Sequence, residues 1–243
     1  MESPIHKFII STALLCLPAL GTSCDDGRIY PEEVQPAERE GWTARVTGTI
    51  CGQDTWAAGY EVVAAAFNAE SDYALITKSI PSGTHEVDLL MNAVPSEATT
   101  VELCVIDRLR QRVATLKRVE ISGNIAPHET IVIDVGTMDA GMLSTLQDHV
   151  LTPRCAACHG LSATAASGIN LTKGHSYAAI VGAPSHRVPD KRIVEPGKSA
   201  ESVLHLMLNT SLSSSWGYDH GNADISDQWK EIITKWIDNG AKE

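Results

Sequence analysis

The sequence predicts two domains of different class, an N-terminal all-β antiparallel sandwich and a C-terminal all-α domain. Between Thr43 and Val135, short runs rich in β-branched and aromatic residues alternate with Gly, Pro, Asn and Asp. After Asp139 the apolar residues recur at helical spacing instead. This change of period places the domain boundary between residues 139 and 140.

The first domain is expected to span residues 41–139. Its strands are expected near 43–50, 60–67, 73–79, 85–91, 100–106, 112–120 and 130–135. Short strands at near-regular spacing are typical of an immunoglobulin-like sandwich. Alternation places Cys51 and Cys104 on the more polar phase of their strands, so neither is expected to be a core thiol.

The second domain is expected to span residues 140–243. A first helix would begin behind Asp139 and end at Pro153. Short helices are expected near 177–181 and 200–208. The clearest helix has Ser226 as its cap and ends at Asn239-Gly240, and it carries one apolar stripe made of Trp229, Ile232, Ile233, Trp236 and Ile237.

The N-terminus resembles an export signal. Residues 1–23 are expected to be a signal peptide, because Phe8 to Leu20 form an apolar run behind Lys7 that is too short to span a bilayer. The stretch Leu20-Gly-Thr-Ser-Cys24 resembles a bacterial lipobox, which implies that Cys24 is lipidated. Residues 24–40 then form a polar tether. The expected location is the bacterial cell envelope, with the protein lipid-anchored at the periplasmic or outer-membrane surface.

One motif in the second domain carries chemistry, Cys155-Ala-Ala-Cys158-His159. Two thiols three positions apart, followed at once by a histidine, attach a c-type haem through two thioether bonds and place an imidazole under the iron. A structural zinc site would need a second pair of ligands at similar spacing, which the remaining cysteines do not provide. A thioredoxin-like pair would follow a strand of a βαβ unit, whereas this pair follows a helical stretch.

The other cysteines can be assigned by compartment. Of the six cysteines, Cys16 lies in the signal segment, Cys24 takes lipid, and Cys155 and Cys158 take haem. Cys51 and Cys104 are left over in an oxidising compartment. The sequence therefore predicts a disulfide between them.

The segment from about Leu146 to the C-terminus resembles the small class I c-type cytochrome domains, in particular the planctomycete-type branch. The matching pieces are the haem motif with Gly160, Gly168-Ile-Asn-Leu171, Ser176-Tyr177, Ile180-Val181, Ile193-Val-Glu-Pro-Gly-Lys198, Ser202-Val-Leu204 and Trp236-Ile-Asp-Asn-Gly-Ala241. The resemblance implies an all-α cytochrome c fold around one covalent haem. It makes Cys155 and Cys158 the attachment points and His159 the proximal ligand.

The distal ligand departs from the pattern of those domains. They present a Met-Pro pair shortly before the last helix, whereas residues 215–225 contain no methionine. His220 lies in this stretch between Gly217 and Gly221, in a loop flexible enough to place a side chain over the haem. Met207 is the alternative, although its apolar neighbours suggest core packing, and an open sixth position is the third option.

These features favour electron transfer by a membrane-tethered monohaem c-type cytochrome, an electron carrier more than an enzyme. The net charge of −11 argues against nucleic acid as a partner and favours a basic redox partner protein. A peroxidase-like haem enzyme is the first alternative, with candidate polar groups at His175, His186, His205 and His220. The second alternative is a binding or scaffold lipoprotein with an accessory or sensory haem.

Overall fold

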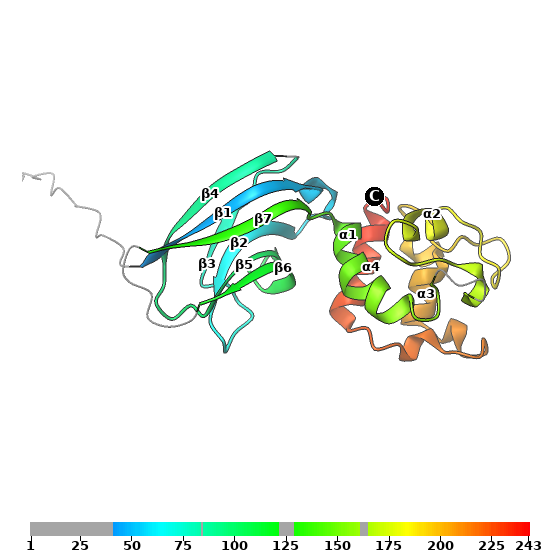
Figure 1. Ribbon diagram of the computed structural model, residues 1–243. Coiled ribbons are helices and arrows are strands. Elements are labelled where there is room, and N and C mark those ends of the chain that lie inside the picture. Colours follow the sequence, from blue (N-terminus) through cyan, green and yellow to red (C-terminus); the bar gives the residue numbers. More distant parts are fainter. Residues whose placement is uncertain (1–40, 84, 122–128, 161–164) are drawn as a thin grey trace, which may run out of the picture. The chain divides into compact units, whose positions relative to one another are not determined.

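The computed structural model describes residues 41–83, 85–121, 129–160 and 165–243. In this part of the chain seven strands come first and short helices follow (Figure 1). The strands are β1 (Trp42–Cys51), β2 (Tyr60–Phe67), β3 (Ile76–Ser79), β4 (His85–Val94), β5 (Thr100–Asp107), β6 (Arg112–Glu120) and β7 (Thr130–Asp139). Each predicted strand is present, with bounds that shift by a few residues.

The strands form two sheets, of order β4-β1-β7 and β3-β2-β5-β6. Every pair is antiparallel except β1 and β7, which run parallel with Val46 opposite Ile133. The predicted purely antiparallel immunoglobulin-like sandwich is therefore wrong. A tight hairpin forces its two strands to be antiparallel, but β1 and β7 lie at opposite ends of the β region, so no hairpin constrains their direction.

Alternation along the strands separates two apolar clusters. Val46 of β1 and Leu103 of β5 belong to the main core, which also includes residues of the helical region. The opposite phase of the four-stranded sheet carries a second, smaller cluster. It consists of Val63, Ala65, Phe67, Cys104 and Ile106. The central strands β2 and β5 of this sheet are therefore buried on both faces, which explains their nearly continuous apolar runs.

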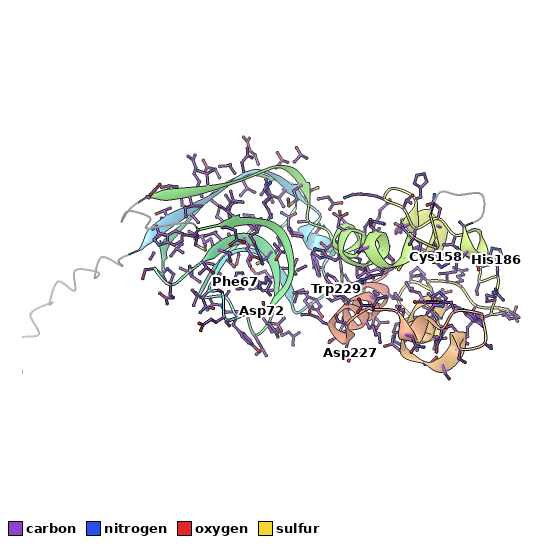
Figure 2. All side chains as sticks on the ribbon, turned by 60° about the horizontal axis from the view of Figure 1, so that its bottom comes forward. Phe67, Asp72, Cys158, His186, Asp227 and Trp229 are labelled. Carbon is purple, nitrogen blue, oxygen red and sulfur yellow. The ribbon has the colours of Figure 1, made fainter. Side chains whose placement is uncertain are left out.

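A buried carboxylate lies on the same outer face. The side chain of Glu102 is fully buried and accepts hydrogen bonds from Arg112 at 2.7 Å, Arg118 at 2.9 Å and Thr115 at 2.7 Å. The Arg112 guanidinium also lies 4.6 Å from the centre of the Phe67 ring. Phe67 lies at the end of β2 (Figure 2). The ion pairs with Arg112 and Arg118 allow Glu102 to be buried while charged.

The helices after β7 are short. They are α1 (Met142–Leu146), α2 (Ser176–Ile180), α3 (Val203–Asn209) and α4 (Asp227–Asp238), together with the π-helical segment η2 (Gln147–Cys155). The remaining 3-10 turns are η1 (Gln53–Thr55), η3 (Ala166–Gly168), η4 (Ser199–Glu201), η5 (Ser211–Ser213) and η6 (His220–Asn222).

The last helix matches its prediction. The Ser226 hydroxyl accepts a hydrogen bond from the Trp229 N–H and caps α4. Ile232, Ile233, Trp236 and Ile237 of its apolar stripe are buried.

The predicted all-α cytochrome c fold is wrong. The described part of the chain is mostly β-sheet, and its C-terminal region combines short helices with turns and isolated bridges such as Val181–Val194. Gly and Pro residues between Gly182 and Gly197 favour turns over helix there. The first helix also differs, because its cap is Gly141 in place of Asp139 and the helical chain continues through Pro153 in η2.

The described residues all belong to one compact unit. The boundary at residue 140 between two domains stays a prediction. The signal peptide, the tether and Cys24 lie outside the described residues. No helix among the described residues is long and apolar enough to cross a bilayer.

The structure does not form the predicted disulfide, and both Cys51 and Cys104 are free thiols. The expectation that neither cysteine is a core thiol is wrong for Cys104, which is fully buried in the second apolar cluster. Alternation also did not show that β1 and β5 belong to different sheets. The outer faces of two packed sheets point in opposite directions. The Cys51 thiol instead donates to the Met138 carbonyl at 3.6 Å, and Cys104 packs beside Phe67.

Candidate functional site

The haem motif forms a tight turn at the end of η2. The backbone N–H groups of Cys158 and His159 both donate to the Cys155 carbonyl, at 3.2 and 2.9 Å. Gly160 permits this turn, because a Cβ atom there would lie 2.8 Å from the Ala156 carbonyl oxygen. The turn therefore presents two cysteines and a histidine from one short backbone segment.

Both cysteines of the motif are free thiols. Cys158 is exposed, in the segment that follows η2 (Figure 2), whereas Cys155 is partly buried. Burial raises the pKa of the Cys155 thiol to about 11, and the neighbouring Cys158 adds to the shift. Two free thiols are the form in which a c-type motif reacts, since each S–H adds across a vinyl double bond without a leaving group.

A backbone carbonyl fixes the orientation of His159. Its Nδ1 donates to the Ala166 carbonyl at 2.9 Å. In a neutral imidazole this leaves Nε2 unprotonated and able to bind a metal. The His159 carbonyl in turn accepts from the Leu171 N–H at 2.7 Å, which ties the motif to the following loop.

The second histidine comes from the short turn η6. The His220 ring lies with its centroid 6.2 Å from that of His159, and the two ring planes differ by 32°. Two aromatic rings contact His220 edge-on, Trp216 at 6.3 Å and Tyr218 at 5.1 Å between centroids. The fold thus brings together two imidazoles that are far apart in the sequence.

The surroundings of His220 favour its neutral form. Burial lowers its pKa, and the nearby His159 lowers it further, while Asp219 and the backbone of Tyr218 act in the opposite direction. The Nδ1 atom of His220 is buried and has no hydrogen-bond partner among the described residues. A buried ring nitrogen without a partner needs an explanation, and a missing ligand is one.

These residues fit one haem. A metal–imidazole nitrogen distance of about 2.0 to 2.1 Å on each side of one metal ion puts the centroids of two axial rings about 6 Å apart, close to the observed 6.2 Å. A haem iron takes at most two ligands from the protein. The described residues contain no group of three or more His, Cys, Asp or Glu side chains that could bind a metal ion. Two histidines are enough to ligate a haem iron, because the porphyrin supplies the other ligands.

The other candidate ligands lie elsewhere. Met207, on α3, packs against the main hydrophobic core. His205 is hydrogen-bonded through Nδ1 to Thr234 Oγ1 at 2.9 Å. His175 is exposed and contacts its own loop through Thr172, and His186 is exposed on the loop after residue 184. Among the described residues, none of these four side chains makes a ring contact or a hydrogen bond with His220.

Sequence reasoning missed the residues that hold the His220 loop. Ser213 is fully buried, its hydroxyl accepts from the His220 N–H at 2.8 Å, and it donates to Asp219 Oδ1 at 3.2 Å. Asp219 Oδ1 also accepts from the Gly221 N–H at 3.0 Å. The available signal was the sequence Asp219-His220-Gly221, because an Asp two residues before a Gly favours this local turn.

Comparison of the chain with protein-family models, with curated proteins and with solved structures finds no match.

Proposed function

We propose that this chain is a monohaem c-type electron carrier that holds its haem through Cys155 and Cys158, with His159 and His220 as the two axial ligands. The observation that carries the proposal is the position of His220. The haem-attachment motif ends in a histidine, and the centroid of its ring lies 6.2 Å from that of a second, partly buried imidazole.

Each residue has a defined task in this proposal. The thiols of Cys155 and Cys158 hold the cofactor covalently, so that it cannot be lost outside the cell. The Ala166 carbonyl fixes the His159 tautomer, and Trp216 and Tyr218 flank the second imidazole. When bound, haem supplies the one-electron iron couple, and two imidazoles hold it at a lower potential than histidine with methionine.

Electron transfer agrees better with the site than peroxidase-like turnover does. A haem enzyme needs an open distal position with polar groups beside it, whereas the His220 imidazole takes that position in the proposal. The neighbours of that ring are aromatic, and His205 is engaged with Thr234. Electron transfer requires only ligation, burial and tuning from the protein.

The proposal also covers where the protein lies in the cell and which kind of protein it exchanges electrons with. A lipid on Cys24 would tether the protein to a membrane of the bacterial cell envelope. The net charge of −11 favours a basic redox partner protein, because opposite charges speed diffusional encounter.

Covalent attachment tests the proposal. The protein is expressed with the c-type maturation machinery, its intact mass is measured, and the haem is extracted with acid and organic solvent. We expect a mass increase of one haem and no extraction. Cys155→Ser and Cys158→Ser should each leave one thioether and change the spectrum, and Cys51→Ser, outside the motif, should load normally. Haem that is fully extractable from the unmodified protein contradicts the proposal.

A further inference from the structure

The His220 loop is held by a small polar network that the haem motif does not supply. Asp219 caps η6, since its Oδ1 accepts from the Gly221 N–H, and its Oδ2 lies 3.3 Å from the Asn222 side-chain amide. Ser213, on η5, links this carboxylate to the His220 N–H. The His220 N–H is thus bonded to Ser213, which is bonded to Asp219, and Asp219 in turn bonds the N–H of the next residue, Gly221.

Burial distinguishes this network from an ordinary surface turn. Ser213 is fully buried, and its hydroxyl uses both its donor and its acceptor capacity within the network. A hydrogen bond to an ionised carboxylate is stronger than one between neutral groups. The loop would otherwise be free to move, because glycines stand at positions 217 and 221 and Gly217 has a φ of +88°.

We propose that Asp219 and Ser213 are positioning residues that hold the His220 imidazole opposite His159 and so keep the distal position closed. This inference rests on the proposed function, because it presupposes a haem between the two histidines. The two residues act through the backbone of His220 and do not touch the iron.

The inference predicts how often the distal position opens. An external ligand such as carbon monoxide binds ferrous haem only after the distal histidine leaves, so its apparent binding rate reports the fraction of open molecules. Removing hydrogen bonds to a charged group shifts such an equilibrium by about tenfold or more. Asp219→Ala and Ser213→Ala should therefore bind carbon monoxide about tenfold faster than the unmodified protein.

Two variants separate positioning from charge and from general damage. Asp219→Asn keeps an oxygen that accepts from Gly221 and Ser213, in weaker bonds because the charge is lost, so its rate should lie between the unmodified rate and that of Asp219→Ala. Asp227→Ala removes an equal charge from the fully exposed first residue of α4 (Figure 2), outside the network, and should leave the rate unchanged. His220→Ala gives the rate of a fully open site.

The experiment is stopped-flow mixing of the reduced, haem-loaded variants with carbon monoxide, with thermal unfolding measured in parallel. Fast binding by Asp219→Ala and Ser213→Ala, with slower binding by Asp219→Asn than by Asp219→Ala, supports the inference. If Asp219→Ala does not fold, the rate of Ser213→Ala decides. If these variants match the unmodified, six-coordinate protein, the positioning role is overturned while the proposed function stands. If His220→Ala also matches it, His220 is not the ligand, and both proposals fail at that residue.

Discussion

The imidazole rings of His159 and His220 lie with their centroids 6.2 Å apart and their planes inclined by 32°. One ring comes from the turn that ends the haem motif, and the other from η6, just before the last helix. Because His159 has its Nδ1 bonded to a carbonyl and His220 has a buried Nδ1 without a partner among the described residues, the pair is suited to bind a metal between them.

Replacing His220 should open the distal position. We expect His220→Ala to change a low-spin haem spectrum into a high-spin one that binds carbon monoxide, because one axial imidazole is lost. Met207→Leu, the control on α3, should keep the low-spin spectrum, because Met207 packs against the hydrophobic core. Absorption spectra of both ferric variants provide the comparison. The opposite pattern would make Met207 the ligand.

The thiols of Cys51 and Cys104 should both be free. Burial raises the pKa of each, so at a given pH fewer thiolates form in the native protein than in an ordinary thiol, and alkylation should accelerate as the pH rises. Cys104, which is fully buried, should react only after unfolding. Peptide mapping after alkylation in denaturant without reductant should find label on both residues. A peptide that joins them by a disulfide would contradict the structure.

Glu102 should be a major determinant of stability. Glu102→Ala removes the hydrogen bonds of this carboxylate with Arg112, Arg118 and Thr115, and we expect it to lower the free energy of unfolding by about 1 to 3 kcal/mol, because the guanidinium groups left behind reach solvent. Glu102→Gln should cost less, because one oxygen remains as an acceptor. Asp88→Ala breaks an exposed pair with Arg45 and should have no measurable effect. Denaturant unfolding of the three variants would show equal stabilities if the network contributed nothing.

Lipidation of Cys24 remains a prediction from the sequence. Cys24→Ser should move the protein from the membrane fraction to the soluble fraction, because the single proposed anchor is lost. The matched control, Cys51→Ser, should stay with membranes. A Cys24→Ser variant that loses its signal segment and still sediments with membranes would require another anchor.

Local patterns predicted much of the secondary structure but little of its arrangement. Alternation located the strands, and the Ser226 cap and apolar stripe located α4. Alternation did not show that Cys104 is buried in a second apolar cluster. Alternation does not reveal which sheet a strand joins, so the disulfide and the purely antiparallel sandwich were wrong. A resemblance carried by short motifs did not establish the fold of the segments between them, which are largely turns.

The residues of the candidate site were likewise predictable only in part. The cysteines and His159 were predicted because their chemistry depends on adjacent positions, and His220 was chosen from its place in a glycine-flanked loop. Ser213 and Asp219 were missed because hydrogen bonds between side chains and a distant backbone depend on how the loop closes. The contacts of Trp216 and Tyr218 with His220 likewise follow from tertiary structure alone.

The absorption and electron paramagnetic resonance spectra of the matured, unmodified protein decide whether two imidazoles hold one covalent haem. We expect a low-spin, six-coordinate ferric haem without the weak far-red band of a methionine–iron bond, and a haem that stays with the polypeptide after acid extraction. A high-spin spectrum, a methionine–iron band or an extractable haem would contradict ligation by His159 and His220.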